Sequence, residues 1–135
     1  MRVTSPLDVV TAWARAVDDF DEGALIALAD EDLELVTPRG TQRGHDALRG
    51  WLARQTYGVA PRYERRRVFV RGDTVVVDLH LEFRYVDGGK VAGSQDLAIG
   101  YAVQDGLVRR ITAHPDLGSA LSASGLDEAD EADIV

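Results

Sequence analysis

Four long segments with β-strand character follow one another from Arg62 to His114, after about sixty residues that are mainly helical in character. The second of these segments, Asp73 to Tyr85, would extend on the order of 43 Å at about 3.3 Å per residue. A globule of 135 residues is only about 37 Å across. The sheet is therefore expected to bend, and helices laid across its hollow side would enclose a small-molecule pocket.

Length and composition limit the class of protein. A chain of 135 residues has the size of one hydrophobic core, and it contains no cysteine, which excludes disulfides, thiolate metal sites and cysteine nucleophiles. Residues Met1 to Leu7 lack the apolar run of a signal peptide. No stretch approaches the roughly eighteen apolar residues that a membrane span requires. We expect a soluble, cytoplasmic protein with no membrane partner.

Charge is unevenly distributed along the chain, whose formal net charge is −8. The end of the chain carries five acids and no base, namely Asp127, Glu128, Asp130, Glu131 and Asp133. Because residues 120–135 also lack an apolar period, we predict a solvated acidic C-terminal tail over 121–135, behind a domain that spans 1–120. A short helix or a partner-binding segment is the alternative for this region.

A cluster of arginines on the first long strand could indicate a nucleic-acid-binding patch. Its members are Arg62, Arg65, Arg66, Arg67 and Arg71. On a strand these side chains alternate between the two faces, where they can pair across the sheet with Asp78, Glu82 and their neighbours. We therefore expect no nucleic-acid partner.

Three helices are predicted before the long strands. The first begins at a capping-box-like start, Ser5 to Asp8, with proline at its first position, and its apolar stripe ends near Phe20. Asp21 caps a shorter second helix, and the third occupies about 46–57. Between the last two helices, residues 33–37 form a short strand that a proline ends.

The four long strands are predicted at about 62–71, 73–85, 90–104 and 107–114, separated by glycine- and aspartate-rich tight turns. Consecutive strands should therefore be antiparallel neighbours. Gly93 and Gly100, and the three-residue spacing of Val108, Ile111 and His114, suggest bulges that bend the sheet. These elements predict an α+β fold, a cone-shaped, strongly curved antiparallel sheet with three N-terminal helices packed on its concave face.

The second long strand has one apolar and one polar face. The apolar set is Val75, Val77, Leu79, Leu81, Phe83 and Tyr85. Exposing these side chains would cost on the order of 9 kcal/mol or more, so this face should point inward. Asp78, His80 and Glu82 have a spacing that could present metal ligands, but they then lie outside with Arg84 as surface charges. No metal site is expected.

Several short motifs in chain order resemble a known group of proteins. They are Trp13 on the first helix, the run 28–33, the segment from Gly40 to Gly44, and the closing run 105–111. Over residues 5–116 this arrangement resembles the nuclear transport factor 2 superfamily, and within it the SnoaL-like group of polyketide cyclases and their uncharacterised relatives. The resemblance implies a cystatin-like conical α+β barrel with a pocket open at one end, often a homodimer through the outer sheet face.

The chain departs from the ketosteroid isomerases of that superfamily at their functional positions. Trp13 stands where those enzymes have a tyrosine, and Thr37, directly before Pro38, replaces the aspartate base. Ala98 or Ile99 replaces the protonated aspartate, which is a worked example of a raised carboxyl pKa. Threonine cannot abstract a carbon-bound proton near neutral pH. Isomerase chemistry by that route is not expected.

His114 and Asp116 are the candidate catalytic residues, because the resemblance places the end of the last strand where such pockets open. A carboxylate near a histidine can orient it and raise its basicity, which produces a general acid or base near pH 7. The alternative is a capped strand end at which Pro115 turns the chain and both side chains meet water.

The predicted pocket lining is mainly aromatic with a few neutral hydrogen-bonding groups. Its members are Trp13, Thr37, Trp51, Gln55, Tyr57, Gln95 and Tyr101. Such a lining suits a flat apolar or aromatic ligand without a cofactor. The alternative is that both tryptophans are ordinary core residues that fill the cone.

Two functional hypotheses follow. One is a cofactor-independent cyclase, isomerase or hydrolase in which His114 and Asp116 transfer protons. The other is a non-catalytic module that binds an apolar metabolite or serves in dimerisation. They differ in whether an ionisable side chain faces the pocket, and an outward-facing His114 favours the binding module.

Overall fold

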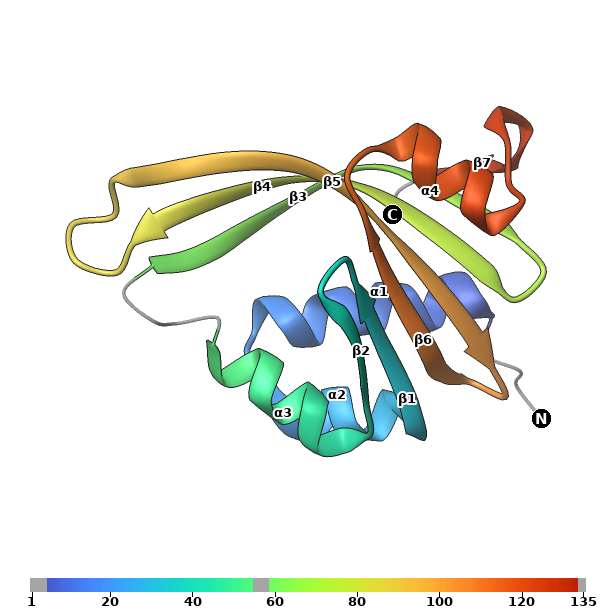
Figure 1. Ribbon diagram of the computed structural model, residues 1–135, viewed down its shortest axis with the longest axis horizontal. Helices are drawn as coiled ribbons and strands as arrows, with labels where there is room; N and C mark the ends of the chain where they lie inside the picture. The colour runs from blue at the N-terminus through green and yellow to red at the C-terminus, as the bar shows by residue number, and fades with distance from the viewer. Residues whose placement is uncertain (1–4, 55–58, 134–135) are drawn as a thin grey trace.

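The computed structural model describes residues 5–54 and 59–133. Figure 1 shows its elements, which in chain order are α1 (Pro6–Asp18), α2 (Glu22–Leu28), β1 (Ala29–Thr37), β2 (Gly40–Arg43), α3 (His45–Arg54), β3 (Val59–Arg71), β4 (Thr74–Tyr85), β5 (Val91–Gln104), β6 (Leu107–His114), α4 (Leu117–Ser124), the 3-10 helix η1 (Glu128–Asp130) and β7 (Glu131–Ala132). None of the helices described is both long enough and apolar enough to cross a membrane.

The strands form one strongly bent, unclosed sheet in the order β2-β1-β6-β5-β4-β3-β7 (Figure 1). The predicted α+β class is confirmed, and each long strand begins and ends within three residues of its predicted bounds. Two details differ from the prediction. The segment from Gly40 is a short strand rather than a turn, and β1 runs parallel to β6 while the other neighbours are antiparallel.

Irregular pairing bends the long strands. One bulge interrupts the β4–β5 register opposite Gly93, and another interrupts the β5–β6 register between Ala102 and Val103, opposite Val108. Irregularities were predicted near Gly93 and between Val108 and Ile111, whereas Gly100 and the stretch from Ile111 to His114, which were also named, pair regularly. A third bulge, between Arg65 and Arg67 of β3, was not predicted. The start of β3, the end of β4 and the start of β5 extend beyond the helices (Figure 1). We call this part of the sheet the arm.

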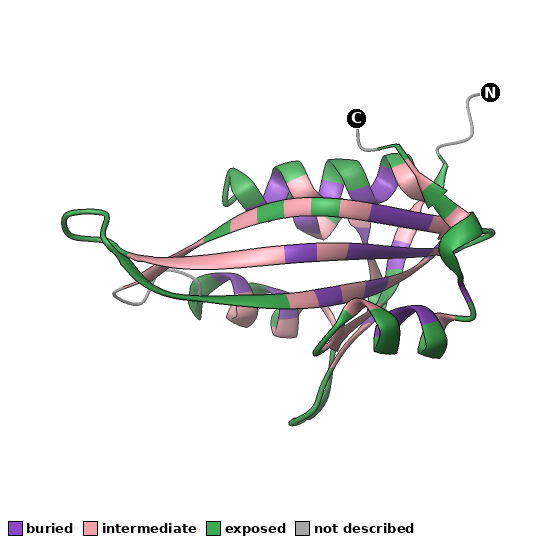
Figure 2. Ribbon diagram, turned by 90° about the horizontal axis from the view of Figure 1, so that it is seen from above, coloured by how far each residue is buried: buried purple, intermediate pink, exposed green. Residues whose placement is uncertain are grey.

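Helices α1, α2 and α3 cover the concave face of the sheet. The Ser5 hydroxyl caps α1 by accepting the Asp8 N–H at 3.2 Å, as the sequence predicted. Trp13 and Leu25 of these helices pack in one buried cluster with Val77 and Leu79 of β4. Burial is concentrated in the halves of β3, β4 and β5 that lie away from the arm, and on the inner sides of the helices (Figure 2). The apolar face of β4 thus points inward, as expected.

The C-terminal segment is not a solvated tail, and this expectation for residues 121–135 is corrected for the described part, up to residue 133. Helix α4 packs on the outer face of the sheet, where Leu121 and Leu126 join Phe69, Val76 and Ala98 in a second buried cluster. Strand β7 then pairs with the β3 edge. Leu121 and Leu126 are too few to produce an apolar period, so the sequence did not indicate that this segment packs on the sheet. Helix α4 also covers part of the outer face through which a homodimer is predicted.

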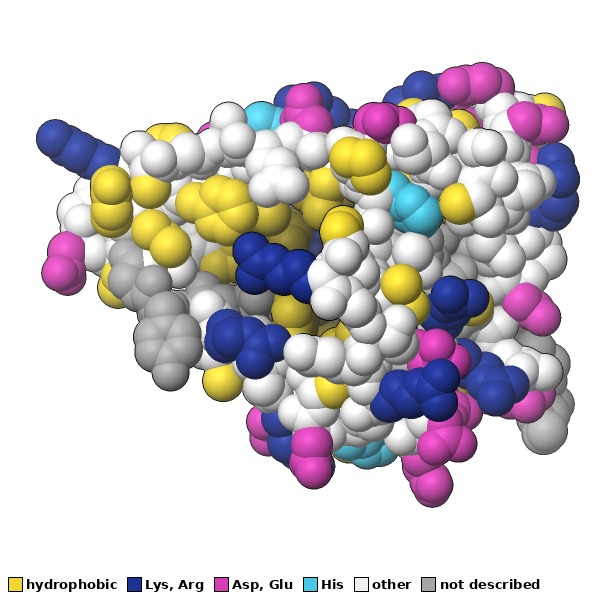
Figure 3. Space-filling model, viewed as in Figure 1, with side chains coloured by type: hydrophobic (Ala, Val, Ile, Leu, Met, Phe, Trp, Pro, Cys, Tyr) yellow, Lys and Arg dark blue, Asp and Glu magenta, His cyan; other side chains and the backbone are white. Residues whose placement is uncertain are grey.

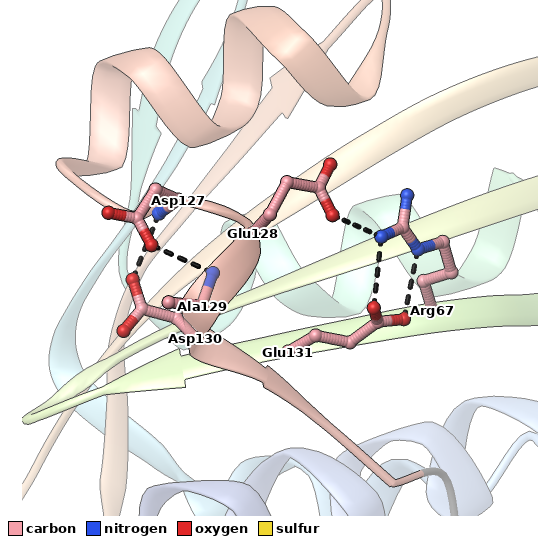
Figure 4. Close-up of polar contacts among 6 residues, drawn as sticks. All are labelled: Arg67, Asp127, Glu128, Ala129, Asp130 and Glu131. Carbon is pink, nitrogen blue, oxygen red and sulfur yellow. Dashed lines mark hydrogen bonds and ion pairs between the residues drawn. The ribbon is translucent and has the colours of Figure 1, made fainter.

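The terminal acids bind the arginines of β3. Arg67 donates to Glu128 and, at 2.9 Å, to Glu131 (Figure 4). Arg71 lies 2.7 Å from Asp130. We call residues 127–131 the C-terminal clasp. The guanidinium of Arg67 holds the pKa of Glu131 below its usual range. The two charged segments of the sequence therefore neutralise each other.

The predicted partners of these arginines across the sheet are wrong in part. Glu82 pairs with Arg84 of its own strand at 2.6 Å, and Arg66 approaches Asp96 of β5 at 3.6 Å. Arg67 and Arg71 reach the clasp because β7, which begins at the last clasp residue, pairs with β3 at the edge of the sheet.

Candidate ligand-binding site

A cavity of about 320 Å³ lies between the concave sheet face and helices α1 and α3. Hydrophobic side chains gather in a hollow below the arm of β3, β4 and β5 (Figure 3). The wall is mainly apolar and aromatic, and its residues are Trp13, Val17, Leu35, Val36, Thr37, Leu48, Trp51, Tyr63, Arg65, Leu79, Leu81, Phe83, Leu97, Ile99, Tyr101, Ile111 and Ala113.

The structure places four of the predicted lining residues on this wall: Trp13, Thr37, Trp51 and Tyr101. Trp13 is only 3% exposed and also belongs to the buried core cluster. Its side chain therefore packs in the core and lines the cavity at the same time. Both tryptophans of the chain therefore border the cavity. Intrinsic fluorescence should report on whatever enters it.

The other predicted lining residues lie elsewhere. Gln95 is exposed on the arm, opposite Leu81, and is not part of the cavity wall. Gln55 and Tyr57 lie outside the described residues. Thr37 reaches the wall, but its hydroxyl accepts the Arg39 N–H at 3.2 Å and stabilises the turn between β1 and β2.

The predicted acid–base pair is not brought to the cavity. His114 pairs with Ala98, next to the cavity-lining pair Ile99 and Ala113, so it points to the opposite face of the sheet. There its Nε2 lies 3.8 Å from where a Cβ on Gly100 would be.

Asp116 is the N-cap of α4 and accepts the Ser119 N–H at 2.7 Å. That hydrogen bond holds the pKa of Asp116 below its usual range, and His114 adds a smaller electrostatic effect in the same direction. The positions of His114 and Asp116 correspond to the alternative prediction, in which the chain turns at the end of the strand and neither side chain enters the cavity.

From the sequence, Arg65 was recognised only as a member of the arginine cluster, and it was not predicted to be the charged residue on the described cavity wall. Arg65 lies opposite Leu79, and Tyr63 opposite Leu81, both of which face inward. The register of β3 against the apolar face of β4 could have shown that Arg65 faces inward. However, a register extrapolated from the tight turn between β3 and β4 is wrong by one residue at Arg65, because of the bulge between Arg65 and Arg67.

Arg65 is fixed by helix α1. Its Nη1 donates to Asp18 Oδ2 at 3.0 Å, and its Nη2 donates to Asp18 Oδ1 and to the Ala14 carbonyl, each at 3.3 Å. The guanidinium also lies over the Tyr63 ring, 5.6 Å from its centroid. A quarter of the Arg65 side chain stays exposed.

Two tyrosines complete the polar part of the wall. Burial raises the pKa of Tyr63 and of Tyr101 to about 12, and nearby Arg65 opposes this rise in both cases. Both hydroxyls are therefore neutral at physiological pH and can donate hydrogen bonds. The described part of the wall combines the cation of Arg65, the phenolic groups of Tyr63 and Tyr101 and a mainly apolar surface.

Alkaline titration should separate these tyrosines from ordinary ones. Their folded-state pKa of about 12 exceeds the ordinary value of 10.0, so stability is complete below pH 10 and falls as pH rises toward 12. We expect absorbance at 295 nm to show late ionisation coupled to unfolding, and Tyr101→Phe to remove one late proton. Ionisation of all four tyrosines near pH 10 without unfolding would contradict this assignment.

The polar row on the outer face of β4 forms ordinary surface contacts. His80 Nδ1 lies 2.6 Å from Asp96 of β5. Across residues 5–54 and 59–133, no group of three or more His, Asp or Glu side chains is arranged to hold a metal ion.

Comparison with known proteins places this geometry in a family. The SnoaL-like domain model matches residues 10–111, so the chain belongs to the SnoaL-like domain family, as the resemblance predicted. None of the curated proteins matches the chain.

Solved structures show the same fold. An NTF2-like protein from Burkholderia xenovorans LB400 is 25% identical, with a TM-score of 0.70 over 92% of this chain and 98% of that one. TerC, co-crystallised with polyporic acid, is 21% identical with a TM-score of 0.70, covering 88% and 96%. An M. tuberculosis LEH-like epoxide hydrolase is 17% identical with a TM-score of 0.70, covering 90% and 92%.

Proposed function

We propose that the protein binds a small, largely apolar compound, preferably one with an aromatic ring, in the cavity between the sheet and helices α1 and α3. The observation that carries the proposal is the composition of the wall, in which Trp13, Trp51 and Phe83 meet aliphatic side chains around about 320 Å³. An aromatic ring system that buries about 200 Å² gains about 5 kcal/mol from the hydrophobic effect. Part of that gain is lost to the cost of association.

Binding is favoured over acid–base catalysis by the ionisable groups on the wall. On the described wall these groups are Arg65, Tyr63 and Tyr101, none of which is a base near neutral pH. The carboxylate and imidazole proposed for proton transfer, Asp116 and His114, belong to the opposite face. The non-catalytic hypothesis therefore has the better support. A homodimer through the uncovered part of the outer face stays a prediction.

N-Phenyl-1-naphthylamine, a neutral dye that fluoresces in apolar surroundings, tests the proposal. We expect saturable binding with quenching of Trp13 and Trp51. Ala113→Phe should fill part of the cavity and weaken binding about tenfold, because forcing atoms into occupied space costs about 1–3 kcal/mol.

The matched control is Ala123→Phe, which adds the same ring at an exposed position of α4 and should leave dye affinity unchanged. Absence of saturable binding, or equal affinity in both variants, would refute a ligand site in this cavity.

A further inference from the structure

We infer that Arg65, together with the hydroxyl of Tyr101, anchors an anionic oxygen of the ligand. The ligand class is then an apolar ring compound with a carboxylate or an ionised phenol or enol at one end. This inference rests on the proposed function and specifies the chemistry that the same cavity selects.

The charge distribution around the cavity carries the first step. Arg65 is the charged side chain of the described cavity wall, and it also borders, with its partners Ala14 and Asp18, a groove along α1. Asp18 itself does not line the cavity, so the charged group that a ligand meets on the described wall is a cation. Apolar walls of low dielectric strengthen the attraction between that guanidinium and a negative charge.

The donor inventory carries the second step. A guanidinium has five N–H donors, and Asp18 and the Ala14 carbonyl occupy one on Nη1 and both on Nη2. Within the described part of the chain, the Nε–H and the second Nη1–H of Arg65 have no hydrogen-bond partner. The phenolic O–H of Tyr101, which lies near enough to Arg65 for that cation to oppose the rise of its pKa on burial, adds a further donor on the cavity wall.

The acceptors on the wall do not balance these donors. Thr37 is already bonded within the β1–β2 turn, and the other side chains of the described wall are hydrocarbon or indole. A ligand atom that satisfies several donors at once must be an acceptor oxygen, and a charged acceptor forms the stronger bonds. Because Arg65 keeps a quarter of its side chain exposed, approach of an anion requires only partial further desolvation of the guanidinium.

A purely structural role for Arg65 makes a different prediction. In that case the arginine only ties α1 to β3 through Asp18 and Ala14, so disturbing either member of the ion pair would weaken all ligands alike. The anchoring role instead predicts opposite effects at the two residues. Removing Arg65 should harm only the anion, and removing the Asp18 charge should help it.

The experiment uses the full chain and a matched pair of probes, 2-naphthoate and 2-naphthalenemethanol, with binding followed by tryptophan fluorescence. Wild type should bind the naphthoate at least about tenfold more tightly, since a hydrogen bond to a charged group contributes about 1.5–3 kcal/mol. Arg65→Gln should abolish this preference, because it should weaken naphthoate binding much more than alcohol binding. Asp18→Asn should tighten naphthoate binding severalfold.

Arg66→Gln is the matched control, because Arg66 contacts Glu64 and Asp96 and is absent from the cavity wall. Circular dichroism of each variant verifies folding, and Asp18→Asn decides the question if Arg65→Gln fails to fold. No preference for naphthoate in wild type, equal weakening of both probes by Arg65→Gln, or weakened naphthoate binding in Asp18→Asn would overturn the inference. Binding of the neutral dye and the alcohol in those cases would leave the proposed function standing, whereas failure of every probe would reject both.

Discussion

Replacing Phe69 by alanine is expected to lower the free energy of unfolding by about 3–5 kcal/mol. Phe69 is 0% exposed and lies on the outer sheet face, in the buried cluster formed with α4. Its ring is also covered by the Arg67 guanidinium, 4.9 Å from the ring centroid. Truncation removes the transfer free energy of the ring and leaves a void that Val76 and Leu121 can fill only in part.

Chemical denaturation followed by circular dichroism measures this loss. Phe20→Ala is the matched control, because Phe20 is 42% exposed and the same truncation there should cost less than about 1 kcal/mol. If the C-terminal residues were a solvated tail, Phe69 would be exposed as well. Equal destabilisation by the two substitutions would therefore contradict the docking of α4.

The concave half of the fold could be predicted because its signals are local. Apolar periodicity defined the helices and the inner face of β4, and the glycine- and aspartate-rich turns set the ends of the long strands. Trp13 reaches the cavity wall from the apolar face of α1, and Tyr101 reaches it from β5, where it pairs with Val75 of the inner face of β4. Local patterns were sufficient wherever one element alone decided which way a side chain points.

The C-terminal segment could not be predicted in this way, because its partners are distant in the sequence. Arg67 and Glu131 are 64 positions apart, and neither charge indicates that the other will lie beside it. The apolar residues of α4 that pack on the sheet, Leu117, Ala120 and Leu121, are too few to produce a clear apolar period. Long-range pairing on the β3 edge was needed to recognise the segment as part of the folded structure.

The face on which His114 lies could not be predicted, for a geometric reason. The bulge in β6 explains why Val108 and Ile111, three residues apart, share the inner face. Beyond it the strand alternates regularly, so Ala113 lines the cavity and His114 faces outward. A single irregular residue thus decides which face carries the imidazole, and a sequence pattern rarely locates such a residue to within one position.

Replacing Leu121 by aspartate should detach α4 from the sheet and lower stability by about 2–4 kcal/mol, the order of one buried leucine and its immediate contacts. Leu121 is 9% exposed, and its contacts in the outer cluster are apolar, so an aspartate there has no ionic partner in that cluster. Undocking is the expected response, because the burial of an unpaired carboxylate costs more. With eight residues, α4 is too short to stay helical alone.

Limited proteolysis and chemical denaturation together distinguish local release from global unfolding. We expect rapid cleavage within residues 117–133 of Leu121→Asp, while Ser122→Asp, which places the same charge at the exposed neighbouring position, should resemble wild type. The cavity lies on the other face of the sheet, so the neutral dye should bind both variants with unchanged affinity. Loss of dye binding on release of α4 would show that the outer cluster holds the curvature that keeps the cavity open.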